Sequence, residues 1–336
     1  MKICSYVYEH PFGTTTRMGI LINEDTILDP NLVFACDFER EGRFNAREKA
    51  NHTCPSSLHE LLRLIEEPIE ILHRAIGLMT FLDLCKCYSL KDGTKYILKL
   101  GEKVRLTKPL DKIETYRDFF VHERHVETGF KRRNEPIPPA WFEMPVYYKG
   151  ATAGFIGPNE EILWPSYTDV LDYELELGMV IGLDGKNIKA RDAHKHIFGY
   201  TILNDVSARD IQKKEMTVRL GPAKAKDFCS VIGPVIVTAD EFDGVDPDLL
   251  MTAKINGKEW SRGRSSEARF SWAEMIEHAS REEWLLAGDF FGSGTVGTGC
   301  GLELDKWIKE GDVIELEIES IGKLTNIVGK KSDGKF

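Results

Sequence analysis

Short strand-like segments, separated by glycine and proline residues, recur along the chain from about residue 111 to residue 330. They are PVYYKG, ELELGMVIG, IFGYTILNDV, GPVIVTA, LMTAKING, DVIELEIESIG and KLTNIVG. Short helices are expected between them in three places, around 190–197, 207–216 and 271–286. This pattern predicts a mostly β fold with short helices, of the α+β class, over residues 111–330. The last residues, 331–336, have the composition of a disordered tail.

The first 110 residues are expected to form a second, smaller unit, because a chain of 336 residues accommodates two domains. The β-like runs KICSYVY, MGILI and TILDP precede a helical pattern from about Ser57 to Arg74. Ser57 offers a helix cap, with Glu60 three residues later. The apolar run near 74–85 is broken by polar residues and is typical of a packed helix. We therefore predict a small β-rich N-terminal domain, residues 1–110.

The composition excludes several classes of protein. Lys and Arg number 44 against 54 Asp and Glu, a net charge of -10, so the chain lacks the positive surface of a nucleic-acid binder. No apolar stretch approaches the ~18 residues that a membrane helix needs, and the start has no signal-peptide core. A cytoplasmic protein without nucleic-acid or membrane partners is predicted. Seven cysteines without CxxC spacing indicate reduced thiols rather than disulfides or a zinc site.

The stretch LDYELELGMVIG, residues 171–182, carries two carboxylates on one face of an expected strand. Residues i and i+2 of a strand point to the same side about 7 Å apart, so Glu174 and Glu176 face together. A solvated strand face is one interpretation. The following GMVIG is apolar on both faces and favours a buried strand, where two carboxylates repel unless a proton or a cation compensates. A hard divalent cation with oxygen ligands is the second interpretation.

Two further acidic residues are candidates for the same site. Asp205 ends the apolar run of ILNDVSARDIQ just before a helix, where a ligand and a helix cap are equally plausible roles. Asp118 lies in YRDFFVHERHVETG with two histidines close behind. His122, beside Glu123 and Arg124, has the pattern of a charged surface turn. His125 lies in a more apolar setting, where an imidazole is able to take a proton from water.

Two loops downstream carry other candidates. Lys226 precedes Asp-Phe at the entrance of an expected buried strand, although solvation is the usual state of a lysine. The glycine-rich FFGSGTVGTGCG is a tight-turn region or an anion cradle built from backbone N–H groups. It matches neither GxxxxGK[ST] nor a GxGxxG that follows a strand, so nucleotide binding is not predicted.

Taken together, DYELELG, NDVSARDIQ, AKDF, the GSGTVGTG loop and GDVIELEIESIGKLTNIVG resemble the fumarylacetoacetate hydrolase family, in order and spacing. The resemblance covers about residues 105–330. It implies a β-roll catalytic domain, usually in a homodimer, that holds a divalent metal ion (Mg, Mn or Ca). The segment DFFVHERHVETG further resembles the fumarylacetoacetases, whereas residues 1–110 resemble the N-terminal barrel-type domain only loosely.

The resemblance also implies roles for individual residues. The metal ligands would be Asp118, Glu174, Glu176 and Asp205. His125 would be the general base, with Glu303 orienting it and Lys226 contributing charge to catalysis. Substrate contacts would come from Arg133, Tyr148, Gln212, Lys226 and Thr295. Phe120 stands where fumarylacetoacetases carry a tyrosine, so the exact substrate is expected to differ.

Three functions follow as expectations. The first is metal-dependent hydrolysis of a C–C bond in a β-diketone or acylpyruvate-type acid such as fumarylacetoacetate, in which His125 deprotonates the attacking water and Arg133 holds a carboxylate. The second is decarboxylation, hydration or isomerisation of a 2-keto acid, which the same family also performs. The third is a non-catalytic protein stabilised by its metal ion.

Overall fold

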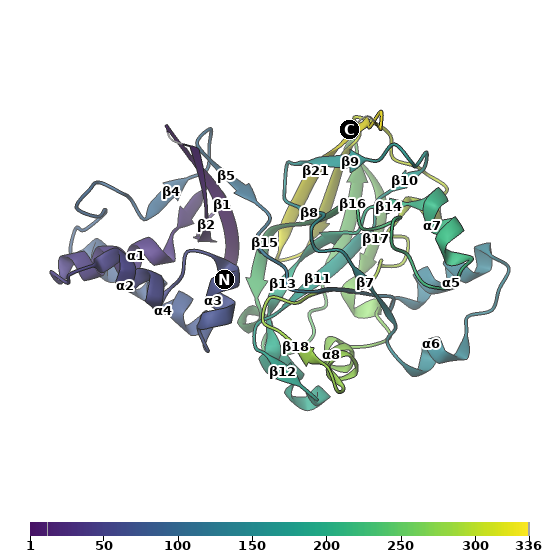
Figure 1. Cartoon of the computed structure of the whole chain (residues 1–336), viewed down its shortest axis with the longest axis horizontal. Helices are drawn as coiled ribbons and strands as arrows, with labels where there is room; N and C mark the ends of the chain where they lie inside the picture. The colour runs from purple at the N-terminus through teal and green to yellow at the C-terminus, as the bar shows by residue number, and fades with distance from the viewer. Residues whose placement is uncertain (12, 335–336) are drawn as a thin grey trace.

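The computed structural model of the chain describes residues 1–11 and 13–334, and within these residues it forms two large β-sheets with helices around them (Figure 1). The larger sheet runs in the order β4 (Ile97–Lys99), β3 (Thr26–Leu28), β2 (Gly13–Leu21), β1 (Lys2–His10), β15 (Ser230–Thr238), β13 (Ile197–Asn204), β11 (Leu175–Ile181), β19 (Phe290–Gly292), β6 (Tyr116–Phe119) and β7 (Tyr147–Gly150). Two more strands join it, β5 (Val104–Thr107) beside β1 and β8 (Phe155–Ile156) beside β15.

The second large sheet is antiparallel except at one edge. Its order is β17 (Lys258–Arg264), β16 (Leu250–Ile255), β20 (Val313–Ile318), β21 (Gly322–Lys331) and β9 (Glu161–Trp164), with β9 parallel to β21. Two short ribbons complete the strands, β10 (Leu171–Asp172) with β14 (Ser207–Ala208) and β12 (Gly185–Lys186) with β18 (Trp284–Leu285). The predicted mostly β fold with short helices is confirmed.

Helices in the larger part of the chain are short. Those expected between the strands are η1 (Ala190–His196), α7 (Arg209–Met216) and α8 (Trp272–Ser280). The structure adds η2 (Ala239–Phe242), η3 (Ser265–Glu267), α5 (Glu123–Arg132), α6 (Pro139–Glu143) and α9 (Gly301–Leu304). Helix α5 begins where the sequence suggested a charged surface turn, and this prediction was wrong because His122, its N-cap, is only 2% exposed.

The N-terminal segment contains more helix than its sequence pattern suggested. It carries α1 (Pro30–Arg40), α2 (Ala46–Thr53), α3 (Leu58–Leu64) and α4 (Pro68–Leu84) beside strands β1–β4. The single helix expected over 57–74 is two helices. Pro68 is the first residue of α4 and keeps the residue before it out of the helical region, so the chain turns there. Ser57 caps α3 as expected, accepting a hydrogen bond from Glu60 N at 3.1 Å.

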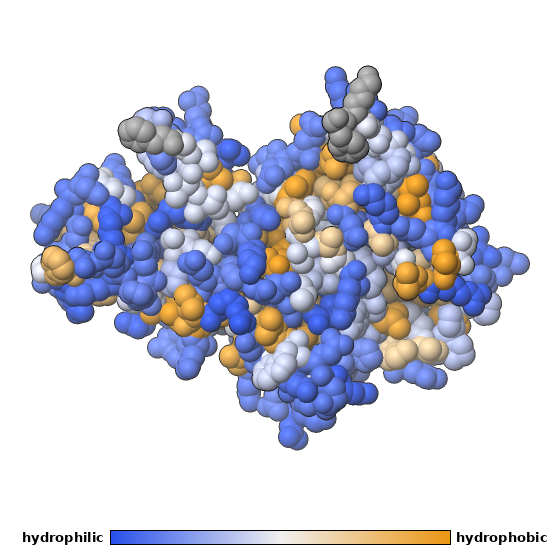
Figure 2. All heavy atoms as spheres, viewed as in Figure 1, coloured by the Kyte–Doolittle hydropathy of each residue, from blue (hydrophilic) through white to orange (hydrophobic). Residues whose placement is uncertain are grey.

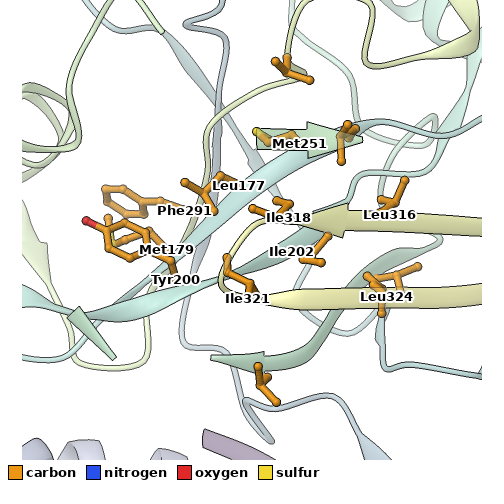
Figure 3. Close-up of a cluster of buried hydrophobic side chains, with 14 of the residues drawn as sticks. Leu177, Met179, Tyr200, Ile202, Met251, Phe291, Leu316, Ile318, Ile321 and Leu324 are labelled. Carbon is orange, nitrogen blue, oxygen red and sulfur yellow. The ribbon is translucent and has the colours of Figure 1, made fainter. Parts of the chain in front are cut away.

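The main core lies between the two large sheets. Figure 3 shows Leu177 of β11 and Ile202 of β13 facing the second large sheet. Their neighbours there include Leu316 and Ile318 of β20 and Leu324 of β21. Every residue of β11 is buried, so both faces of this strand are covered. The apolar run that favoured a buried strand over a solvated face is therefore confirmed.

A second apolar cluster joins the N-terminal helices to the larger sheet. Figure 1 shows the N-terminal lobe at the left, with β1 running beside β15. Buried Leu72 of α4 belongs to the same cluster as Leu203 of β13 and Phe290 of β19. Because β1 also continues the larger sheet, a domain boundary at residue 110 stays a prediction.

The C-terminal tail is more ordered than expected over the described residues. Lys331, predicted in a disordered tail, is the last residue of β21, and the N–H of Ser332 donates to the carbonyl oxygen of Trp164 at 2.9 Å. The prediction was wrong for these residues because β21 pairs with β9. Residues 335–336 lie outside the described residues.

The visible surface is mostly hydrophilic, with scattered hydrophobic patches over both lobes (Figure 2). Among the described helices, none combines the length and the apolar character needed to cross a bilayer.

Candidate active site

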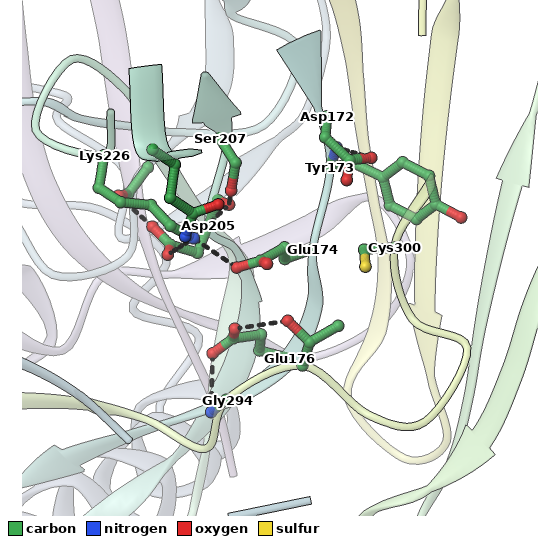
Figure 4. A network of polar contacts seen from close by, with 12 residues as sticks. Asp172, Tyr173, Glu174, Glu176, Asp205, Ser207, Lys226, Gly294 and Cys300 are labelled. Carbon is green, nitrogen blue, oxygen red and sulfur yellow. Dashed lines mark hydrogen bonds and ion pairs between the residues drawn. The ribbon is translucent and has the colours of Figure 1, made fainter. Parts of the chain in front are cut away.

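Four buried carboxylates converge where neighbouring strands of the larger sheet lie side by side. One oxygen from each of Asp118, Glu174, Glu176 and Asp205 lies within 4.8 Å of the others. Figure 4 shows Glu174 and Asp205 turned toward each other, with Glu176 alongside. The four residues predicted as metal ligands are therefore brought together by the fold.

The strand order explains the convergence. β13, β11, β19 and β6 are consecutive in the sheet, and Leu175 of β11 pairs with Asn204 of β13. This register places Glu174 and Glu176 next to Asp205, which follows β13 directly. Helix α7 begins after Ala208, its N-cap, so the helix-cap interpretation of Asp205 is wrong.

Gly292 makes room for the cluster on β19. It pairs with Asp118 of β6 on one side and with Gly178 of β11 on the other. A Cβ atom at Gly292 would lie 2.4 Å from Asp118 Oδ1 and 2.9 Å from Glu176 Oε2. A side chain at position 292 would displace the two carboxylates. The site therefore requires glycine at this position.

The negative charge of the cluster is only partly balanced. Burial, reinforced by the charge of Asp205, raises the pKa of Asp118 well above its usual value. Burial and the charge of Asp118 do the same to the pKa of Glu176. Asp118 Oδ1 is buried and has no hydrogen-bond partner among the described residues. Four oxygen donors with one orphaned atom fit a hard divalent cation, which compensates the charge and supplies the missing contact.

Lys226 supplies part of the balancing charge. Its ammonium group lies 2.5 Å from Glu174 Oε2 and also contacts the carboxylate of Asp205. Burial lowers the pKa of Lys226, but the charges of Asp205 and Glu174 outweigh it and the net shift is upward. The side chain is thus buried and charged, as its position before a buried strand suggested, and its usual solvated state does not apply.

Arg209 and Asp172 complete the network, and sequence reasoning missed both. Arg209 donates to Glu174 Oε1 at 2.7 Å, to Asp172 Oδ2 at 2.8 Å and to Gln212 Oε1 at 2.9 Å. Asp172 also accepts from the N–H groups of Gly301 and Leu302, which open α9. The signal that could have found Arg209 is its place three residues before Gln212, on the same face of a helix.

A histidine–carboxylate pair lies beside the cluster. His125 Nδ1 is 3.0 Å from Glu303 Oε2, and the two residues come from the adjacent helices α5 and α9. The carboxylate favours the tautomer with hydrogen on Nδ1, which leaves Nε2 free to accept a proton. Burial opposes ionisation of Glu174, but the charges of Lys226 and Arg209 outweigh it and hold the pKa of that carboxyl well below its usual value, with His125 a smaller influence. The predicted pairing of Glu303 with His125 is therefore present.

Two other residues near this pair were not expected there. Cys300 Sγ lies 3.5 Å from Glu303 Oε2 and 4.0 Å from His125 Nδ1. His122 is fully enclosed and both its ring nitrogens lack partners among the described residues, so burial lowers its pKa to about 3. Phe120, which replaces the expected tyrosine, packs edge-on against the His125 ring, with centroids 5.4 Å apart.

The predicted substrate contacts divide into two groups. Tyr148 donates to Asp205 Oδ2 at 2.7 Å, and Thr295 donates to Glu176 Oε1 at 3.3 Å, so both lie at the cluster. Gln212 reaches it through Arg209. Arg133 lies apart: it is half exposed at the end of α5, pairs with Glu135 and stacks over Phe130. The geometry therefore places four of the five predicted contacts at the site, with Lys226 described above.

Comparison with known proteins assigns this arrangement to a family. The family model described as fumarylacetoacetate (FAA) hydrolase C-terminal matches residues 115–329. The oxaloacetate tautomerase YisK of Bacillus subtilis (strain 168) is 35% identical over 218 residues, which are 64% of this chain and 67% of that protein. The mitochondrial oxaloacetate tautomerase FAHD2A of Homo sapiens is 32% identical over 59% of this chain and 62% of its own length.

Several solved structures match nearly the whole fold, and one of them serves as the example. It is the fumarylacetoacetate hydrolase of psychrophilic Exiguobacterium antarcticum, with a TM-score of 0.66 and 24% identity over 98% of this chain and all of that one. The relatives matched by sequence thus share about two thirds of their length with this chain, whereas the structural match extends through its N-terminal lobe.

The four-carboxylate site places the chain in the class of enzymes that hold a divalent metal ion through carboxylate oxygens. Within that class, the chain belongs to the fumarylacetoacetate hydrolase family.

Proposed function

We propose that the protein is a divalent-metal-dependent tautomerase that interconverts the keto and enol forms of a short 2-keto dicarboxylic acid such as oxaloacetate. The observation that carries the proposal is one oriented proton acceptor, His125, beside a cluster of four carboxylates. The two relatives with 35% and 32% identity, both named oxaloacetate tautomerases, favour this activity over the hydrolysis expected first from the sequence.

The reaction moves one proton between carbon and oxygen. Asp118, Glu174, Glu176 and Asp205 would hold the cation, which when bound would polarise the 2-keto carbonyl. His125 Nε2 takes the proton from the carbon next to that carbonyl, and Glu303 stabilises the imidazolium that results. The proton returns to the enolate oxygen to give the enol.

The remaining side chains hold the substrate oxygens. Lys226 supplies a positive charge, and Thr295 and Tyr148 supply hydroxyl groups close to the cluster. Gln212 adds a side-chain amide that Arg209 keeps in place. Arg133 has its own partner, Glu135, and would reach a substrate carboxylate only through a different side-chain conformation.

Hydrolysis of an acylpyruvate-type acid is the second candidate. It is favoured by Asp118, the fourth carboxylate, and by His125 seven residues later, the pattern that resembles fumarylacetoacetases. In this reaction His125 deprotonates a water molecule that attacks a carbonyl carbon, and the C–C bond breaks to give two acids. Phe120 has no hydroxyl to offer a substrate, which argues against fumarylacetoacetate itself.

A direct assay separates the candidates. Enol-oxaloacetate is supplied with Mg²⁺ and with malate dehydrogenase and NADH, so that only the keto form is consumed. The expected result is faster NADH oxidation that returns to the uncatalysed rate on addition of a chelator. Acylpyruvates are tested in parallel for loss of the diketone absorbance. Cleavage of a diketone without tautomerase activity would replace the proposal by hydrolysis.

The base is tested by His125→Ala. We expect kcat to fall by about 10²–10⁴-fold, the usual contribution of a general base, while metal binding persists. The control is His73→Ala, because His73 is half exposed on α4 and pairs with Asp240. A wild-type protein that binds Mn²⁺ but turns over no keto acid or diketone would restore the non-catalytic interpretation. A homodimer in the cytoplasm belongs to the same proposal, and gel filtration tests the dimer.

A further inference from the structure

His125, Cys300 and Glu303 present three different metal-binding atoms to one point. His125 Nδ1 lies 3.0 Å from Glu303 Oε2, Cys300 Sγ lies 3.5 Å from the same oxygen, and Cys300 Sγ lies 4.0 Å from His125 Nδ1. We call these three residues the NSO triangle. It shares no residue with the carboxylate cluster, although Cys300 is bridged to Glu174 through the backbone.

The size of the NSO triangle matches a tetrahedral zinc site. Zinc bonds of about 2.3 Å to sulfur and about 2.0–2.2 Å to nitrogen and oxygen place neighbouring ligand atoms about 3.3–3.6 Å apart. The three separations observed, 3.0, 3.5 and 4.0 Å, bracket that range. Rotamer adjustments of a few tenths of an ångström would equalise them. Three protein ligands also leave a fourth position open, as in zinc sites that admit water or substrate.

The surroundings favour a cation at this point. The side chains of His125 and Glu303 are 10% and 4% exposed, and Cys300 is fully buried. Glu303 Oε1 is buried without a hydrogen-bond partner among the described residues, so the carboxylate has an unused oxygen. Burial raises the pKa of the Cys300 thiol, with Asp172 and Glu174 adding to the effect against Arg209. A bound dication reverses that shift, because it displaces the thiol proton.

We propose that the NSO triangle is a second metal site, specific for a borderline-soft divalent cation such as Zn²⁺, and that its occupation inhibits the enzyme. A thiolate and an imidazole select Zn²⁺ over Mg²⁺, whereas the all-oxygen cluster selects a hard cation. The two sites are adjacent but differ in the cations that they take.

The inhibitory part rests on the proposed function. When the cation binds Nδ1 of His125, the remaining ring proton must occupy Nε2, and one proton leaves the Cys300 thiol for solvent. A histidine with hydrogen on Nε2 has no free nitrogen to accept a proton from substrate. Glu303 is drawn to the cation at the same time and no longer orients the base. Zinc would therefore remove the base without displacing the hard cation.

Cobalt(II) tests the site without any assay of activity. The 336-residue chain, kept reduced by a phosphine and saturated with Mg²⁺ at the carboxylate cluster, is titrated with Co²⁺. We expect one Co²⁺ per chain with a thiolate-to-cobalt charge-transfer band, which carboxylate ligands do not give. Zn²⁺ should abolish the band and should lower turnover with the same concentration dependence.

Two variants assign the band to the NSO triangle. Cys300→Ser should lower the Co²⁺ affinity at least about 100-fold and remove the band, because loss of a ligand costs more than loss of an outer-sphere partner. The double variant Cys36→Ser/Cys87→Ser is the matched control. In the wild type the sulfur atoms of Cys36 and Cys87 lie 3.2 Å apart in the N-terminal lobe and offer the competing thiol site. The band should survive unchanged in the double variant.

The outcomes are distinct. No band in the wild type, or a band that survives Cys300→Ser and disappears in the double variant, overturns the proposal. If Cys300→Ser does not fold, Glu303→Gln decides, and an unchanged Co²⁺ affinity in that variant also overturns it. A band lost with Cys300 supports the metal site even if oxaloacetate is not a substrate, so failure of the proposed function is recognised separately.

Discussion

At the scale of single residues, Asp172 has the most consequential position outside the predicted ligands. Its two oxygens accept from Arg209 Nε and from the backbone N–H groups of Tyr173, Gly301 and Leu302. Arg209 in turn holds the ligand Glu174. One buried carboxylate thus connects the metal cluster to α9, the helix that carries Glu303. We regard Asp172 as a positioning residue.

The variant Asp172→Asn tests this connection. Every partner of the two oxygens is a donor, so an amide NH₂ group would face a donor in either orientation. We expect a stability loss of about 3–5 kcal/mol and a 10–100-fold weaker Mn²⁺ affinity. Chemical denaturation and calorimetric titration measure them. Asp192→Asn is the control, since Asp192 pairs with Lys195 on the surface, and it should change neither quantity.

His122 predicts a pH dependence of stability. Its pKa is lowered to about 3 by burial, with His125 adding to the shift, against 6.5 for an ordinary histidine. Between those values the unfolded chain binds a proton that the folded chain does not. This residue therefore contributes stability that is fully present at neutral pH and is lost progressively as pH falls below 6.5.

The variant His122→Leu should remove that contribution while keeping the volume of the side chain. We expect its stability relative to wild type to improve steadily between about pH 7 and about pH 4, where histidines titrate. Denaturation midpoints across this range measure the difference. A constant difference would contradict the assignment, because other acid-sensitive groups act equally on both proteins.

At the scale of elements, strands set the geometry of the site through their spacing. β19 lies between β11 and β6, and Gly292 is the position where the two flanking strands present Glu176 and Asp118. A glycine on an exposed helix face has no such constraint on an added side chain. Gly77 of α4 is exposed, and a Cβ atom there would meet nothing within 4 Å.

The same change at these two glycines should have opposite effects. Gly292→Ala should weaken Mn²⁺ binding at least about 10-fold, because the methyl group would displace two ligands. Gly77→Ala should leave metal binding intact and raise stability by up to about 1 kcal/mol, the difference in helix propensity. Titration calorimetry and thermal unfolding provide both measurements. Equal Mn²⁺ affinity in the two variants would show that Gly292 is not required.

At the scale of the whole molecule, the second apolar cluster links the N-terminal helices with the larger sheet. Leu72 and Ile71 of α4 share it with Val180, Phe198 and Leu203. Because β1 also hydrogen-bonds to β15, the lobes share both a core and a sheet. We therefore expect them to unfold together, although chains longer than about 150 residues often do not.

Two probes test this expectation. All 6 tryptophans follow residue 110, so their fluorescence reports on the larger part, whereas far-ultraviolet circular dichroism reports on both. The two transitions should coincide. Leu72→Ala should cost about 2–5 kcal/mol and shift both equally, while Leu64→Ala, at a residue 70% exposed, should shift neither. A shift of the dichroism alone would mean that the N-terminal lobe unfolds independently.

Much of the fold and of the ligand set was predictable because it is written in local patterns. Runs that alternate apolar and polar residues, or that are apolar on both faces, predicted β11, β13 and β15. Such runs are readable in the sequence because side chains alternate between the two faces of any strand, whatever packs against it. Glu174 and Glu176 precede an apolar run that favoured a buried pair over a solvated strand face, and the family resemblance named them as metal ligands together with Asp205. His125 and Lys226 were candidates from their local setting, and the resemblance gave each of them a role because its motifs keep their residues in one short segment.

Tertiary structure alone decided the partnerships between segments far apart in sequence. Asp172 meets Gly301 across 129 residues, and Cys300 meets His125 across 175. Cysteine spacing argued against a zinc site because such rules detect only ligands that are close in sequence. The NSO triangle instead combines His125 of α5 with Cys300, the N-cap of α9, and Glu303 within α9. His122 and Arg133 lie four and fifteen residues after Asp118, yet one is enclosed and the other exposed. The burial of a side chain depends on the segments that pack against it, and these segments come together only in the tertiary structure.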